Sequence, residues 1–123
     1  MYKQDYHVED GTLFLNLSGE FPKKLLKTLH NVFSPLAEAL ATYQCNRILI
    51  DARNLAVEMN ILELMKSGED LATGLPPGTY IAMVTTSQQY NRFFEDVAVN
   101  RGALMQVFTD VAKAKEWLVT KTT

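Results

Sequence analysis

The sequence predicts an α/β domain with the element order ββαβαβαβα. Three observations support this class: two alternating segments joined by Asp10-Gly11, a short segment at residues 48–51 that is apolar up to its final Asp51, and later segments whose apolar residues recur at helical spacing. The length of 123 residues suits one core that buries most of its apolar surface. We therefore expect a single domain over residues 1–123.

The first two strands are predicted as an antiparallel hairpin. Residues 2–8 and 12–18 flank the turn, and Leu13, Leu15 and Leu17 alternate with other residues along the second strand. An Asp-Gly pair favours a tight hairpin turn because these residue types tolerate the positive φ that the turn requires. The chain is thus expected to open with two paired strands.

A helix is predicted to begin near Pro22, because proline suits the first helical position. Pro35 interrupts this segment, since proline lacks an N–H and its ring crowds the preceding turn. We expect either a kink at Pro35 or a break in which Ser34 caps a second helix. The face expected to pack on the sheet comprises Leu25, Leu29, Val32, Leu36, Leu40 and Tyr43.

The remaining elements alternate between strands and helices. Residues 48–51 are typical of a central strand buried on both faces. Asn60 can cap a helix that continues through Ala72, with Glu63 completing a capping box. The later elements are a strand at residues 80–85, a helix at 88–101 with Ser87 as its cap and Gly102 at its end, a strand at 105–108, and a closing helix after Asp110.

Composition argues against several functional classes. The 12 Lys+Arg and 14 Asp+Glu residues give a formal net charge of -2, whereas non-specific nucleic-acid binding depends on a clustered basic surface. No apolar run approaches the roughly 20 residues that span a bilayer, and the first residues carry no secretory signal. Cys45 is the lone cysteine, which excludes an internal disulfide and a Cys-rich metal site. We expect a cytoplasmic protein with no metal, cofactor or nucleic-acid partner.

Catalysis is not expected. His7 and His30 lie far apart, on a predicted strand and a predicted helix, whereas a general base must stand within hydrogen-bond reach of its nucleophile. The sequence contains no Gly-rich phosphate loop, paired-His motif or nucleophile elbow. A non-enzymatic binding protein is therefore favoured.

The chain contains an ordered set of short patterns: Leu17-Ser18-Gly19-Glu20, Arg47-Ile48-Leu49-Ile50-Asp51, Val97-Ala98-Val99-Asn100-Arg101-Gly102, Val107-Phe108-Thr109-Asp110 and Ala114-Lys115-Glu116-Trp117-Leu118. This set resembles the bacterial STAS-like, SpoIIAA-like family, and in particular its STAS/Sec14-type members. It covers essentially the whole chain. The resemblance implies a mixed sheet of four or five strands with about four helices packed mainly on one face.

The resemblance also implies two roles. Anti-sigma factor antagonists carry a phosphorylatable serine at the start of the helix after the central strand, where the added charge controls partner binding. Counted from Asp51, the matching positions are Met59, Asn60 and Ile61, so we do not expect this switch. The leading hypothesis is regulation through a protein partner or a homodimer. The alternative is carriage of a small apolar, lipid-like ligand between the sheet and the helices.

Three sets of residues are candidates for a site. An interaction or ligand loop follows the central strand: Asp51, Arg53, Asn54, Glu58 and Asn60. An apolar pocket or interface combines a Met-rich helix with aromatic residues: Met59, Leu62, Met65, Tyr90, Phe93 and Phe94. An anion site joins hydroxyl groups to a cation: Thr85, Thr86, Ser87 and Arg92. Each set also has a purely structural explanation: turn chemistry for the loop, core packing for the apolar residues and N-capping for the hydroxyl groups.

The doublet Phe93-Phe94 carries one further expectation. Adjacent helical residues point in different directions, so both rings cannot face one core. We expect one of the two rings at the surface or in a groove.

Overall fold

The computed structural model describes residues 1–88 and 92–121, and for His30 the backbone alone. Within these residues five strands form one sheet in sequence order. The strands are β1 (Lys3–Glu9), β2 (Thr12–Glu20), β3 (Arg47–Ala56), β4 (Tyr80–Val84) and β5 (Leu104–Phe108). The helices are the 3₁₀ helix η1 (Lys23–Lys27), α1 (Leu29–Thr42), α2 (Ile61–Gly74), α3 (Arg92–Asn100) and α4 (Val111–Val119). The predicted α/β class and element order are confirmed.

The sheet is mixed. β1 and β2 pair antiparallel, and every later pair of neighbouring strands is parallel. Asp10 and Gly11 connect the hairpin with φ angles of 51° and 74°, which are the positive values that its tight turn needs. The predicted hairpin is therefore confirmed.

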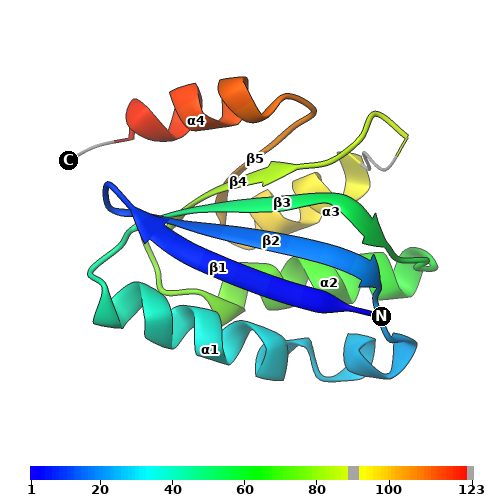
Figure 1. The fold of residues 1–123 in the computed structure, drawn as a ribbon. Helices are drawn as coiled ribbons and strands as arrows, with labels where there is room; N and C mark the ends of the chain where they lie inside the picture. Colours follow the sequence, from blue (N-terminus) through cyan, green and yellow to red (C-terminus); the bar gives the residue numbers. More distant parts are fainter. Residues whose placement is uncertain (89–91, 122–123) are drawn as a thin grey trace.

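The helices form two unequal layers. α1, α2 and α3 each connect two parallel strands that are neighbours in the sheet, and right-handed crossovers in one direction place such helices on the same face. α4 follows the last strand and lies on the opposite face from α1 and α2 (Figure 1). The expectation of helices mainly on one face is confirmed.

Each layer encloses its own core. Ile48 and Ile50 of β3 belong to the core under α1, α2 and α3, whereas Leu49 belongs to the core under α4. β3 is therefore buried on both faces, as predicted for a central strand. The smaller core comprises Leu49, Ala82, Val84, Ala114 and Leu118.

Of the two alternatives predicted at Pro35, a kink or a break, the break is wrong, because α1 continues through this residue. The helical segment is interrupted earlier, at Thr28, where φ is -133° between η1 and α1. Ser34 thus lies inside α1 and does not cap a second helix. The carbonyl that loses its helical donor at Pro35 belongs to Asn31, which is exposed, so water can bind there.

The ends of α2 and α3 follow local sequence signals in part. Asn60 caps α2 in the predicted capping box, with Asn60 Oδ1 accepting from the Glu63 N–H at 2.8 Å and the Glu63 carboxylate accepting from the Asn60 N–H at 3.0 Å. Gly102 ends α3 as predicted, with a φ of 100°. Ser87 and Gln88 form a turn and not a helix start, and residues 89–91 of that predicted helix lie outside the described residues.

Candidate functional site

β3 continues beyond the end of β4, and this overhang forms one wall of the candidate site. Asp51 is the last β3 residue paired with β4, opposite Val84, yet β3 extends to Ala56. The overhang stays paired with β2 as far as Glu20 opposite Ala56. The prediction that the strand ends at Asp51 and a loop follows is therefore wrong. Pairing with β2 holds these polar residues in extended backbone.

A bulge in β3 sets the direction of the side chains in the overhang. Asn16 pairs with Asp51 and Ser18 pairs with Asn54, so Leu17 alone stands opposite residues 52 and 53. The extra residue shifts the alternation of side chains along β3, as bulges do. Even-numbered Ile50 faces the helices before the bulge, and odd-numbered Leu55 lines a cavity on that side after it.

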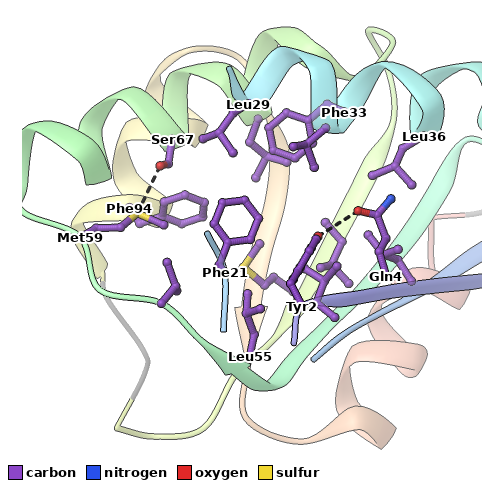
Figure 2. Close-up of a pocket in the computed structure, with 17 residues that line it drawn as sticks. Tyr2, Gln4, Phe21, Leu29, Phe33, Leu36, Leu55, Met59, Ser67 and Phe94 are labelled. Atoms are coloured by element: carbon purple, nitrogen blue, oxygen red, sulfur yellow. Dashed lines mark hydrogen bonds between the residues drawn. The ribbon is translucent and has the colours of Figure 1, made fainter. Parts of the chain in front are cut away.

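The described residues enclose two adjoining cavities between the sheet and the layer of α1, α2 and α3. The inner chamber has a volume of about 100 Å³. Side chains from the sheet and from all three helices converge on it (Figure 2). Its mainly apolar lining includes Leu17, Phe21, Phe33, Leu55, Met59 and Phe94.

The polar side chains of the inner chamber have hydrogen-bond partners. The Tyr2 hydroxyl donates to Gln4 Oε1 at 2.9 Å, and Ser67 Oγ donates to the Glu63 carbonyl at 2.7 Å (Figure 2 draws the former). Burial raises the pKa of the Tyr2 hydroxyl, which keeps it protonated at neutral pH. The chamber therefore presents an apolar surface to any occupant.

The outer cavity is a cleft of about 630 Å³ beside the overhang. This volume lies within the roughly 300–1,000 Å³ of small-molecule sites, whereas the inner chamber alone is too small. Both cavities share the side chains Leu17, Leu55, Val57, Met59, Met83 and Phe94. The rest of the cleft is lined by Ala52, Arg53, Leu64, Thr85, Thr86, Gln88 and Val107.

Arg53 is held at the cleft by Asp51. Its Nε donates to Asp51 Oδ1 at 3.0 Å and its Nη2 donates to Oδ2 at 2.8 Å. The hydrogen bonds from Arg53 lower the pKa of the Asp51 carboxyl, and those to Asp51 raise the pKa of Arg53. The positive charge that faces the cleft is thus closely balanced by a carboxylate.

Thr85 lines the cleft and carries a buried hydroxyl that is left unsatisfied. The residue is only 8% exposed. Its backbone N–H donates to the Phe108 carbonyl at 2.9 Å, but Oγ1 is buried and has no hydrogen-bond partner among the described residues. Leaving a buried hydroxyl unpaired costs about 1–3 kcal/mol, so such a group calls for an explanation.

The residues of the predicted interaction loop do not lie together in one loop. Asp51, Arg53 and Asn54 lie in β3, while Glu58 is exposed between β3 and α2. Asn60 is the cap of α2. Of this set only Arg53 lines the cleft.

The predicted apolar set divides between the inside and the outside of the molecule. Met59 and Phe94 line both cavities, whereas Leu62, Met65 and Phe93 are exposed. The expectation that one ring of Phe93-Phe94 reaches the surface is thus confirmed. Tyr90 lies outside the described residues.

The predicted anion set does not converge on one point. Thr85 is buried in the cleft wall, while Thr86 and Ser87 are exposed. Arg92 is also exposed and lies 4.0 Å from Asp96 on its own helix. The cation that lines the cleft with Thr85 and Thr86 is Arg53, because the overhang of β3 carries it there.

Sequence reasoning missed most of the cleft residues. Leu17, Ala52, Leu55, Met83 and Val107 come from strands. The strand periodicity of these residues indicated that they are buried but not that they line a cleft. The one signal for a site was that Met83 and Val107 lie near the carboxyl ends of parallel strands, where ligands of α/β sheets bind.

Two structural searches give negative results for the described part of the chain. No group of three or more His, Cys, Asp or Glu side chains there is placed to hold a metal ion. No helix there combines the length and hydropathy needed to cross a membrane.

Solved structures overlay on nearly the whole chain. An anti-sigma factor antagonist from Mycobacterium paratuberculosis gives a TM-score of 0.68 at 12% identity, covering 97% of this chain and 95% of that one. SpoIIAA in its unphosphorylated form gives 0.54 at 13% identity, covering 100% of both chains. This chain has a SpoIIAA-like fold. An uncharacterised protein with a SpoIIAA-like fold from Shewanella loihica PV-4 gives 0.56 at 14% identity, with coverages of 95% and 93%.

The resemblance detected in the sequence is thereby confirmed for the SpoIIAA-like fold. No family model matches the chain, and no curated protein does.

Replacing the unpaired hydroxyl should stabilise the protein. Thr85→Val keeps the shape of the side chain and removes the buried polar atom, so we expect the free energy of unfolding to rise by about 1–2 kcal/mol. Thr79→Val is the matched control, because buried Thr79 Oγ1 donates to the Pro76 carbonyl at 2.7 Å. It should lower stability by about 1 kcal/mol. Urea denaturation measures the free energy of unfolding of both variants. Equal losses of stability in the two would contradict the finding that Thr85 Oγ1 is unpaired.

The Asp51–Arg53 pair should make stability depend on pH. Because the pKa of Asp51 is lowered in the folded state, the pair stabilises the protein above the ordinary pKa of the carboxyl and loses this effect as the pH falls. Asp51→Asn should cost about 1 kcal/mol near pH 7, and the difference should shrink below about pH 4. Exposed Asp5→Asn on β1 is the control. A cost that persists at acid pH would contradict this account.

Proposed function

We propose that this SpoIIAA-like domain is a non-enzymatic regulatory module that acts by binding a protein partner. Two of the overlaid structures are anti-sigma factor antagonists, which are named for their action against another protein factor. The proposal extends that mode of action to this chain. Cytoplasmic location and the absence of a nucleic-acid partner stay predictions from composition.

The observation that carries the proposal is an exposed apolar surface at the start of α2. Ile61, Leu62 and Met65 expose 64%, 67% and 38% of their areas. Their spacing places them together on the outside of the helix, and neighbouring Val57 is also exposed. Contiguous apolar side chains at a surface are typical of protein-binding sites. We name Ile61, Leu62 and Met65 the α2 surface.

The proposal does not include a phosphoserine switch at the start of α2. Asn60 occupies the cap, and its carboxamide accepts the Glu63 N–H but offers no hydroxyl for a phosphoryl group. Ser67, in the middle of α2, is buried and donates to the Glu63 carbonyl. A kinase would need to unwind the helix to reach it. Partner binding is therefore proposed to be controlled by other means.

The α2 surface can be tested by reversing its polarity. Leu62→Glu should reduce recovery of the partner from the native host at least tenfold, because a buried charge at an apolar interface is strongly unfavourable. Val119→Glu, on exposed α4 residue Val119, is the matched control and should leave recovery unchanged. Affinity enrichment with quantitative mass spectrometry measures the effect. Equal recovery with both variants would refute the proposal.

Sedimentation velocity tests whether the partner is a second copy of the chain. A homodimer through the α2 surface predicts that Leu62→Glu is monomeric at concentrations where the Val119→Glu protein is dimeric. A wild-type monomer that still captures a different protein assigns the surface to a heterologous partner.

A second candidate function is carriage of a small apolar ligand. The adjoining cavities support it, because together they combine a cleft of small-molecule size with an apolar inner chamber. This ligand site lies between the sheet and the helices, whereas the α2 surface faces outward. The two functions are thus separable by mutation.

Filling the cleft should abolish carriage. Ala52→Phe places a ring in the cleft, since Ala52 lines it, while Ala56→Phe alters an exposed position of the same strand that lines neither cavity. Native mass spectrometry of protein from its own host should find a small-molecule adduct on wild type and Ala56→Phe only. An adduct retained by Ala52→Phe would exclude the cleft as its location.

A further inference from the structure

We infer that the outer edge of β1 binds a second copy of this chain, so that two sheets join through antiparallel β1 strands centred on Tyr6. This edge belongs neither to the α2 surface nor to the lining of the cleft. Three observations carry the inference: the edge is open, its main-chain groups suit a two-fold pairing, and its charges complement themselves.

The two edges of the sheet differ in how they are covered. At the β5 edge, the Val107 N–H donates to the Glu95 carboxylate of α3 at 2.6 Å, so a side chain of the same chain occupies a main-chain donor there. At the other edge, β1 pairs with β2 alone among the described residues, and α4 packs on the distant strands β3, β4 and β5 (Figure 1). An open edge strand presents N–H and C=O groups that another strand can bind.

The hairpin turn determines which main-chain groups of β1 point outward. Residues 10–11 form a two-residue turn with positive φ at both positions, and Glu9 and Thr12 pair directly beside it. The pair that flanks such a turn exchanges both of its hydrogen bonds, and bonded pairs then alternate with unbonded pairs along an antiparallel ladder. The remaining residues of β1 therefore direct their main-chain groups to the open edge at every second position: Val8, Tyr6 and Gln4.

The charges of β1 reverse about Tyr6. The strand reads Lys3-Gln4-Asp5-Tyr6-His7-Val8-Glu9. When Tyr6 lies opposite Tyr6 of the second copy, Lys3 lies opposite Glu9 of that copy and Asp5 lies opposite its His7. Opposite charges at directly opposed positions stabilise an antiparallel pair, and an imidazole N–H can donate to a carboxylate whether or not the ring is charged. The two-fold axis makes each of these pairs occur twice.

Neighbouring registers bring like charges together. A pairing centred on Asp5 places this carboxylate opposite its own copy, and one centred on His7 places Asp5 opposite Glu9; both arrangements are unfavourable. The polar side chains of residues 3, 5, 7 and 9 are already exposed, and strand alternation puts them on the face where His7 stacks on Phe14. Charges on an edge strand usually oppose pairing, but this order permits one register, which closes at two copies.

Exchange of the charges at positions 3 and 9 tests the inference on the full chain. Sedimentation velocity should show wild type as monomer and dimer with a Kd on the order of 10 μM, as expected for a small interface. Lys3→Glu and Glu9→Lys should each weaken dimerisation about tenfold or more, because symmetry creates two like-charge pairs in each variant. The double variant Lys3→Glu/Glu9→Lys should restore the wild-type affinity. An equimolar mixture of the two single variants should form a heterodimer, which also shows that both are folded.

The controls change net charge equally at exposed positions of α4. Lys113→Glu matches Lys3→Glu and Glu116→Lys matches Glu9→Lys, and both should dimerise as wild type does. Leu62→Glu should also remain dimeric, because the α2 surface lies outside this interface.

Three results would overturn the inference. The first is a wild-type protein that is monomeric at about 1 mM. The second is a dimer that both single variants leave intact, and its loss in Leu62→Glu would assign it to the α2 surface. The third is a double variant that stays as weak as the single ones, which would exclude the register centred on Tyr6. The other proposals are tested separately, since below about 1 μM such a dimer is largely dissociated.

Discussion

The pairing of β2 with the overhang of β3 is the constraint on which the candidate site depends. It holds Arg53 and Leu55 beside the end of β4, and the Phe21 N–H extends it by donating to the Ala56 carbonyl at 2.9 Å. Gly19 of β2 has a φ of 83°, and a Cβ there would lie 2.0 Å from the Met1 carbonyl oxygen. Glycine at this position therefore lets the start of the chain close the inner chamber with Tyr2.

α2 connects the two proposed functions because its two sides have different environments. Leu64 lines the cleft and Ser67 the inner chamber, while the α2 surface points to solvent. The capping box fixes where the helix begins. Gly68 brings α3 close, since a Cβ there would meet Val97 Cγ1 at 3.0 Å. Any change in the position of α2 would therefore alter the cleft and the partner surface together.

Features with local causes were predictable from the sequence, and features that depend on distant pairing were not. The turn at Asp10-Gly11, the cap at Asn60 and the end of α3 at Gly102 follow from backbone preferences of a few residues. The overhang of β3 depends on β2, more than 30 residues earlier, so its polar sequence was misread as a loop. Helical period grouped Leu62 with Met59, although Met59 is half-buried and lines both cavities while Leu62 is exposed.

Thr85 illustrates what a sequence pattern conceals. A hydroxyl next to a strand end is usually explained by a turn or a helix cap, and only the packing of β4 against its neighbours shows that this one is buried and unpaired. Valine would fill the same space without the cost of an unsatisfied group, about 1–3 kcal/mol. That cost is a sizeable part of the roughly 5–15 kcal/mol that stabilises a typical domain.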